Sequence, residues 1–129
     1  MDKLMQDATI NSKIVSIDAF PLMKYSLIQG VGGELEPCVK LGDKVKIGTT
    51  IAKPRKGMLG ADLHSSVSGE VVKIVKEEID KDLSCTVIYV KNDGLNETKE
   101  PLKMPENASF EDLCEHLQKC GVIGFGGGG

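Results

Sequence analysis

Aromatic side chains are scarce in this sequence, and tryptophan is absent. Phe, Tyr and Trp make up 4% of the 129 residues, whereas apolar residues as a whole make up 40%. Proteins that hold single-stranded nucleic acid stack its bases on aromatic side chains, so the composition argues against that class. The core must instead be built from Val, Ile and Leu, and the length is that of one domain.

A strong charge of either sign is also lacking. The formal net charge at pH 7 is −3, and the sequence pI is about 5.4. Proteins that bind DNA or RNA normally carry an excess of basic residues that neutralise the phosphates. Nucleic acid is therefore not an expected partner.

Long hydrophobic runs are missing as well. No run reaches the roughly 18 apolar residues of a membrane-spanning helix, and the opening MDKLMQDATINSK has no apolar core of a secretory signal. We therefore expect a cytoplasmic protein with no direct insertion into a membrane. In that compartment the cysteines are expected to stay reduced; they are Cys38, Cys85, Cys114 and Cys120.

The sequence does contain a series of short apolar stretches separated by Gly, Pro, Asp and Ser. Between Tyr25 and Val90 these stretches have the length of short strands. Such spacing is typical of an all-β sandwich or barrel. Just before them, KIVSIDAF is rich in β-branched residues and ends at a proline, which predicts a first strand at 13–19. Residues 1–12 are polar and are predicted to be a flexible arm.

Two glycines mark turns in which the backbone should need a positive φ. Gly42 precedes an aspartate between apolar positions, and Gly69 comes just before the alternating run that starts at Val71. Glycine adopts a positive φ without the steric cost that a side chain brings. Each turn is therefore predicted to depend on its glycine.

Near the end of the chain the apolar period becomes helical. From Phe110 onwards, apolar residues fall at i, i+3, i+4 and i+7, with Cys114 among the positions predicted to pack in the core. Ser109, with an acid three residues later, has the pattern of an N-cap, and Gly121 suits the position after a helix end. We predict a helix at about 110–120, with Cys120 at its end.

Four parts of the chain follow from these patterns. They are the arm at 1–12, a β-domain at 13–94, a proline-containing linker at 95–107, and a last part at 108–129 that holds the helix and a glycine-rich end. The expected fold class is mainly β with one short C-terminal helix.

VKLGDKVKIGTTIA and the later HSSVSGEVVKI together resemble a biotinyl/lipoyl-type barrel-sandwich hybrid, a small fold of two facing β-sheets. In the carrier domains of that type, a lysine on the central hairpin is acylated by biotin or lipoate. Aligning Gly48 and Gly69 with the two glycines of the pattern puts Met58 at the carrier position. The resemblance therefore supports the fold and opposes a carrier function.

A narrower resemblance covers about Tyr25 to Gly129. SLIQGVGGELEPCVKLGDKVKIGTTIA is similar to the opening of the RnfC-like family, the C subunits of Rnf electron-transport complexes. HSSVSGEVVKI resembles that family's H-A-x-x-S-G-x-V-x-x-I, and VKNDGLNE resembles its short strand ending in D-G. CGVIGFGGGG is similar to the loop with which the family's flavin and nucleotide module opens. The order and spacing of the pieces are more specific than any one of them.

The chain also departs from this family pattern. Gly30 stands where His is frequent, Gly128 stands where Ala is usual, and the sequence stops at Gly129, before the rest of the flavin module. No C-x2-C-x2-C-x3-C cluster is present. The resemblance therefore implies the front end of such a protein. This chain would hold no cofactor, whereas a full-length relative would hold FMN and iron–sulfur clusters.

The family includes more than one kind of protein. Besides the membrane-bound complex it contains soluble relatives, such as the electron-transfer protein associated with proline reductase, and both fit this sequence. The resemblance accordingly implies a cytoplasmic chain, either free or peripheral to a membrane complex.

Few residues are candidates for a chemical site. No catalytic residue and no metal ligand is predicted. Binding of a cofactor would fall to Gly124, Gly126 and Gly127, and only if the chain continued into a flavin module, because a glycine loop binds phosphate at the start of a following helix.

The remaining His and Cys residues suggest structural roles. On a helix the side chains of Cys114, His116 and Cys120 diverge, which opposes a metal site. His64 is predicted to hydrogen-bond across its hairpin. Cys38 is the thiol most worth testing for reactivity, because neighbouring Lys40 and Lys44 would lower its pKa.

Three functions remain open after these resemblances. The first is a module of an electron-transfer protein, not an enzyme on its own, that packs against a flavin/nucleotide domain or partner subunits. The second is a modified carrier, and the third is a scaffold or adaptor with no redox link. The GVIGFGGGG ending and the DG strand favour the first. Its docking face would be the basic stretch from Lys44 to Lys56, because electron-transfer partners are commonly acidic.

Overall fold

The structure is a computed structural model, and it describes residues 11–30 and 32–124. The described elements, in chain order, are β1 (Leu22–Ser26), β2 (Glu36–Pro37), β3 (Lys44–Val45), β4 (Thr50–Lys53), β5 (Leu63–His64), β6 (Gly69–Asp80), β7 (Leu83–Asn92) and α1 (Phe110–Lys119). The predicted fold class, mainly β with one short C-terminal helix, is confirmed.

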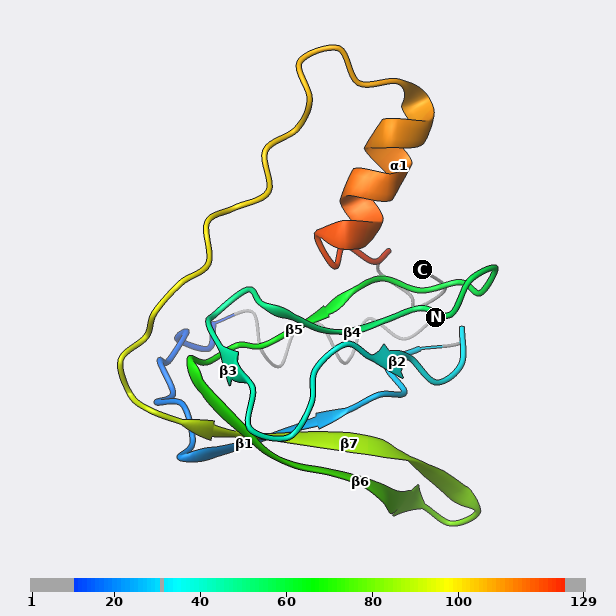
Figure 1. The fold of residues 1–129 in the computed structure, drawn as a ribbon. Coiled ribbons are helices and arrows are strands. Elements are labelled where there is room, and N and C mark those ends of the chain that lie inside the picture. Colours follow the sequence, from blue (N-terminus) through cyan, green and yellow to red (C-terminus); the bar gives the residue numbers. More distant parts are fainter. Residues whose placement is uncertain (1–10, 31, 125–129) are drawn as a thin grey trace.

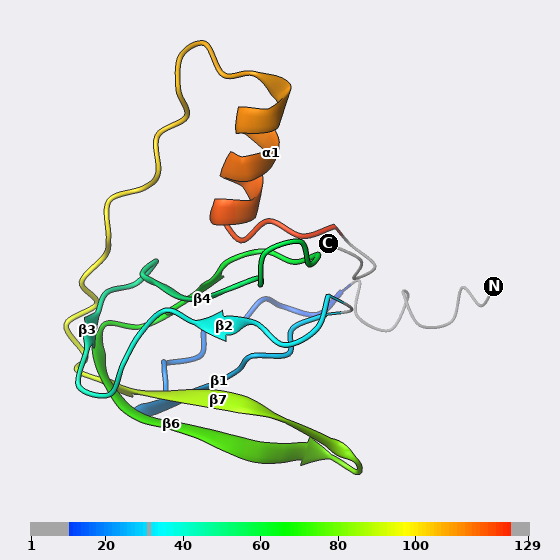
Figure 2. The same ribbon diagram turned by 45° about the vertical axis from the view of Figure 1, so that its right-hand side comes forward.

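The strands form two sheets that face each other (Figures 1 and 2). One sheet has the order β1-β7-β6-β3 and the other has the order β2-β4-β5. Every pairing within them is antiparallel. Aliphatic side chains from both sheets and the loops between them fill the space. The buried cluster contains Tyr25, Leu27, Leu35, Val45, Ile51, Ala52, Val67, Val71, Ile88 and Val90.

The predicted strand at 13–19 is wrong. Residues 12–20 contain no strand, and Ile14 is fully exposed. The first strand among the described residues begins at Leu22 instead, and its pairing with β7 ends where Leu22 lies opposite Lys91. Because β7 itself ends one residue later, the backbone before Pro21 has no strand left to pair with. A β-branched sequence is therefore insufficient here without a partner.

β6 and β7 form a long hairpin whose far half extends beyond the rest of the sandwich (Figure 1). Val71 lies opposite Val90 and Lys73 lies opposite Tyr89, so Val72 has no partner of its own. The extra residue is a β-bulge. It changes which side chains face inwards, because Val71 before it is buried and Ile74 after it packs against the core.

Helix α1 has the ends that the sequence predicts. The Ser109 hydroxyl accepts a hydrogen bond from the backbone N–H of Asp112, and the Asp112 carboxylate accepts one from the backbone N–H of Ser109. This reciprocal pair is a capping box. Cys120 is the C-cap, and Gly121 has a φ of +74°. Within the described ranges, no helix is long and apolar enough to span a bilayer.

Among the described residues, α1 is hydrogen-bonded to the sandwich at its C-terminal end, where the backbone N–H of Asp62, in the loop before β5, donates to the Gln118 carbonyl at 2.9 Å. Figures 1 and 2 show the helix standing away from β4 and β5, with residues 95–108 leading up to its start. No residue of α1 is buried. The prediction that Cys114 packs in the core is therefore wrong.

Candidate functional site

Two separated sequence motifs meet in space and hold the ends of β6 and β7 together. The buried Ser68 hydroxyl donates to the Asp93 carboxylate at 2.6 Å, and the backbone N–H of Asp93 donates to the Ser68 carbonyl at 3.1 Å. The first of these bonds is the main cause that holds the pKa of Asp93 below its usual value. The S-G motif at Ser68 and the D-G motif at Asp93 are therefore parts of one structural joint. The sequence alone did not predict that these two motifs lie together.

The glycines in the two predicted turns do have positive φ, +87° at Gly42 and +154° at Gly69. Their surroundings differ. A Cβ at Gly69 would lie 1.9 Å from the carbonyl oxygen of Lys91, whereas nothing lies within 4 Å of a Cβ at Gly42. The Gly42 turn is tied to β6 instead, because its backbone N–H donates to the Val71 carbonyl at 2.8 Å.

A second joint crosses the sandwich. Tyr25 comes from β1 in the larger sheet, and its hydroxyl reaches the segment that follows β5 in the smaller one. It accepts a hydrogen bond from the backbone N–H of Ser66 at 3.0 Å and lies 2.8 Å from the Ser66 hydroxyl. The buried Ser65 hydroxyl donates to the Val67 carbonyl at 2.7 Å. These serines of the HSSVSG motif thus stabilise the fold.

The loop at 54–62, between β4 and β5, contains the position aligned with the carrier lysine. The backbone N–H of Met58 donates to the Arg55 carbonyl at 3.0 Å, and Gly57 has a φ of +81°, so residues 55–58 form a tight turn. Met58 itself is 43% exposed. The position is accessible, but a thioether has no amine to acylate.

We expect that co-expression with a biotin or lipoate ligase adds no mass to this chain. The matched variant is Met58→Lys, which places an amine in the same turn and leaves Gly57 with its positive φ. Intact mass spectrometry of both proteins checks this. Added mass on the unsubstituted chain would contradict the prediction, and added mass on the variant alone would support the alignment.

The basic stretch from Lys44 to Lys56 is not one face. Lys44 in β3 pairs with Glu70, and Lys46 pairs with Glu97 at 2.8 Å. The loop that follows β4 lies at the opposite end of the sandwich from β3 (Figures 1 and 2). The predicted docking face is therefore divided into a neutralised part near β3 and a separate part in the 54–62 loop.

The expectation for the Cys38 thiol is also wrong. Partial burial raises its pKa above the ordinary value, and the cation that opposes this effect is Lys53 rather than Lys40 or Lys44. The pairing of β2 with β4, which places Glu36 opposite Lys53, brings Lys53 to the segment that holds Cys38. A raised pKa leaves less thiolate at neutral pH, so the thiol is less reactive.

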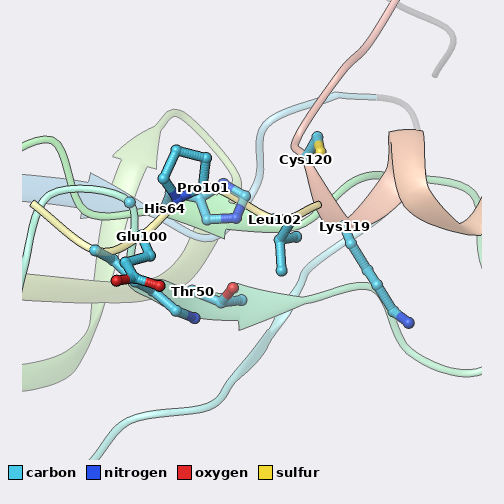
Figure 3. Close-up of a pocket in the computed structure, with 9 residues that line it drawn as sticks. Thr50, His64, Glu100, Pro101, Leu102, Lys119 and Cys120 are labelled. Atoms are coloured by element: carbon cyan, nitrogen blue, oxygen red, sulfur yellow. The ribbon is translucent and has the colours of Figure 1, made fainter. Parts of the chain in front are cut away.

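His64 lines a pocket of about 260 Å³ between the smaller sheet, the linker and the end of α1 (Figure 3). The His64 side chain makes no hydrogen bond to another described residue, so the predicted bond across the hairpin is not found among them. Burial is the main cause that raises the pKa of nearby Asp62. The pocket is lined by Gly48, Thr50, His64, Lys99, Glu100, Pro101, Leu102, Lys119 and Cys120.

Little of the predicted cofactor loop lies within the described residues. Gly124 is exposed and has open space around it, and the other two glycines predicted to bind a cofactor, Gly126 and Gly127, lie outside the described residues. Across residues 11–30 and 32–124, no three His, Cys, Asp or Glu side chains are grouped to hold a metal ion.

Two facing antiparallel sheets, tied together by glycine turns and buried serines, define a barrel-sandwich hybrid domain. The family described as "RnfC Barrel sandwich hybrid domain" matches residues 3–95, and the chain belongs to this family. The resemblance inferred from the sequence is thereby confirmed. Its motifs up to the DG pair lie within the matched residues, whereas the CGVIGFGGGG ending lies beyond them.

Curated relatives agree with this family. The chain is 34% identical over 110 residues to the C subunit of the ion-translocating oxidoreductase complex of Rhodobacter capsulatus, covering 82% of this chain and 21% of the relative. It is 30% identical over 102 residues to the C subunit of the proton-translocating ferredoxin:NAD(+) oxidoreductase complex of Clostridium ljungdahlii, covering 77% and 22%.

A third relative is the C subunit of the ion-translocating oxidoreductase complex of Pseudomonas aeruginosa. It is 31% identical over 125 residues, covering 92% of this chain and 16% of the relative. The chain therefore spans about a fifth of the length of the curated relatives it matches.

Proposed function

We propose that this chain is the N-terminal assembly module of an electron-transferring protein of the RnfC family. It carries no redox centre, and it packs against a flavin/nucleotide domain that holds the FMN. The same contact would serve a soluble relative of the proline-reductase type, because it requires a neighbouring protein domain and no membrane.

The observation that carries this proposal is the exposed apolar face of α1. Phe110 is 76% exposed, and Leu113 and Leu117 are about 40% exposed. These side chains recur at the spacing of one helix face. A capped helix with such a face and no buried residue is expected to bury that face against another protein surface.

The relative from Pseudomonas aeruginosa supports an occupant within the same polypeptide. Its match covers 92% of this chain, so it includes α1 whichever end is left out. In that relative the matched part is 16% of the length, so most of the protein is available to cover the helix.

A matched pair of substitutions tests the contact. Leu117→Asp changes the apolar face and Gln118→Asp changes the next residue, in the same final turn of α1. Both add the same charge near the helix C-terminus, so their cost to the helix itself should be similar. Each is placed in a chimera of the Pseudomonas aeruginosa relative, in which this chain replaces the matching segment.

Hydrogen exchange of the α1 amides is the measurement. We expect exchange about tenfold slower in the chimera than in the 129-residue chain, because packing suppresses local opening. Leu117→Asp should remove this protection, and Gln118→Asp should keep it. Equal exchange rates in the isolated chain and the chimera would mean that α1 has no partner, and the proposal would be wrong.

A further inference from the structure

The 54–62 loop and the residue before it carry a group of side chains that the assembly module does not use. We call Lys53, Arg55, Lys56, Met58 and Leu59 the basic loop tip. All five are exposed, Leu59 by 68%. Other lysines of the sandwich, such as Lys24, Lys44 and Lys46, are paired with glutamates. The three cations of the tip form no ion pair with any residue that the structure describes.

The shape of this tip is fixed by the backbone beneath it. A Cβ at Gly32 would lie 1.7 Å from the carbonyl oxygen of Leu59, so this glycine lets the segment before β2 run directly against the loop. Gly33 has a φ of +96° and approaches the end of the Met58 side chain. The apolar and basic side chains are therefore presented on a supported turn.

The carboxylate of Glu34, which acts on Arg55, already accepts a hydrogen bond from within the sandwich. Glu34 accepts a hydrogen bond from the backbone N–H of Thr86. Hydrogen bonding to Thr86, first from its side chain and then from this N–H, is the main cause that lowers the pKa of Glu34, and Lys76 and then Arg55 add smaller electrostatic effects. Glu34 therefore remains ionised and is held toward β7. No described carboxylate lies within ion-pair distance of the three cations at the turn, so they are available to an external anion.

We propose that the basic loop tip docks this protein on the anionic surface of a lipid bilayer. Lysine and arginine are attracted to anionic headgroups, and adjacent apolar side chains enter the boundary between headgroups and acyl chains. A specific protein interface needs about 800 Å² per partner. A bilayer needs only a protruding turn of this composition, and it requires no pocket around it.

Sedimentation with vesicles tests the proposal. The intact 129-residue chain is mixed with vesicles of phosphatidylcholine and phosphatidylglycerol at about 3:1, and with vesicles of phosphatidylcholine alone. We expect weak, reversible binding to the anionic vesicles that decreases with salt, because the Debye length falls to about 8 Å at physiological ionic strength. Binding to the neutral vesicles should be at least about tenfold weaker.

Three variants separate charge from apolar contact. Lys53→Glu with Arg55→Glu and Lys56→Glu should reduce binding at least about tenfold. Met58→Ser with Leu59→Ser should reduce it about threefold or more, because the apolar contribution is lost. The control changes three exposed lysines elsewhere, Lys40, Lys81 and Lys103, to glutamate. It changes the net charge equally and should keep most of the binding.

Several results would overturn the proposal. Failure to bind anionic vesicles at low salt would do so, and so would an equal loss of binding in the lysine control. Loss in the charge variant with full binding in the serine variant would mean a purely electrostatic contact, as with an acidic protein. Since the tip shares no residue with the apolar face of α1, none of these results bears on the proposed function.

Discussion

Gly69→Val is expected to lower the free energy of unfolding by about 4 kcal/mol, through backbone strain and a steric clash. The backbone φ of +154° is unfavourable for any side chain. In addition, a Cβ would lie 1.9 Å from the carbonyl oxygen of Lys91, which is part of the β6–β7 ladder and cannot rotate away. To relieve this clash, β6 and β7 must separate next to the joint that Ser68 and Asp93 form.

Urea denaturation measures this effect, and substitutions at two further glycines serve as controls. At Gly42 the φ is +87°, but a Cβ would meet open space. In Gly42→Val, backbone strain alone should therefore lower the free energy of unfolding by about 1–2 kcal/mol. Gly124→Val has open space and should change the stability by less than about 0.5 kcal/mol. If the Gly69 and Gly42 variants were equally stable, contact with the Lys91 carbonyl would not be the cause.

Tyr25→Ala should be the second large change, costing about 3–5 kcal/mol, because a buried aromatic ring is removed from the core. Tyr25→Phe keeps the ring and removes only the hydroxyl. It should cost about 1–2 kcal/mol, because the Ser66 backbone N–H loses its acceptor across the sandwich. The difference between the two variants separates packing from hydrogen bonding.

The second tyrosine of the chain is the control for the hydroxyl. The Tyr89 hydroxyl donates to Glu77 at 2.6 Å on the outer side of the larger sheet. Tyr89→Phe should change the stability by less than about 0.5 kcal/mol, because water can replace that bond. A loss in Tyr25→Phe no greater than in Tyr89→Phe would contradict the role assigned to the Tyr25 joint.

Much of the fold was predictable because its signals are local. Helix α1 begins and ends where Ser109 and Gly121 indicate, and both turn glycines have positive φ. The strand predicted at 13–19 failed because pairing is not local. Its composition suits a strand, but pairing with β7 ends where Leu22 lies opposite Lys91. No further backbone of β7 is available to pair with residues 13–19.

The errors about individual sites have a similar cause. Lys44 and Lys56 are close in the chain, but β4 runs between them and carries them to opposite ends of the sandwich. The cation that acts on the Cys38 thiol is Lys53 rather than Lys40 or Lys44, because β2 pairs with β4. The Ser68–Asp93 joint joins residues 25 positions apart. Its only signal in the sequence was that both pieces resemble motifs of one family.

The unpaired Val72 also governs how the long hairpin can vary in length. Val71 and Ile74 are three residues apart, so an uninterrupted strand with its period of two would turn them to opposite faces. The extra residue corrects this phase and lets both side chains reach the interior. Loss of Val72 alone would leave the two side chains two positions apart, on one face of a regular strand. A one-residue deletion at the bulge would therefore shorten β6 and still leave the inward-facing side chains on the inner face.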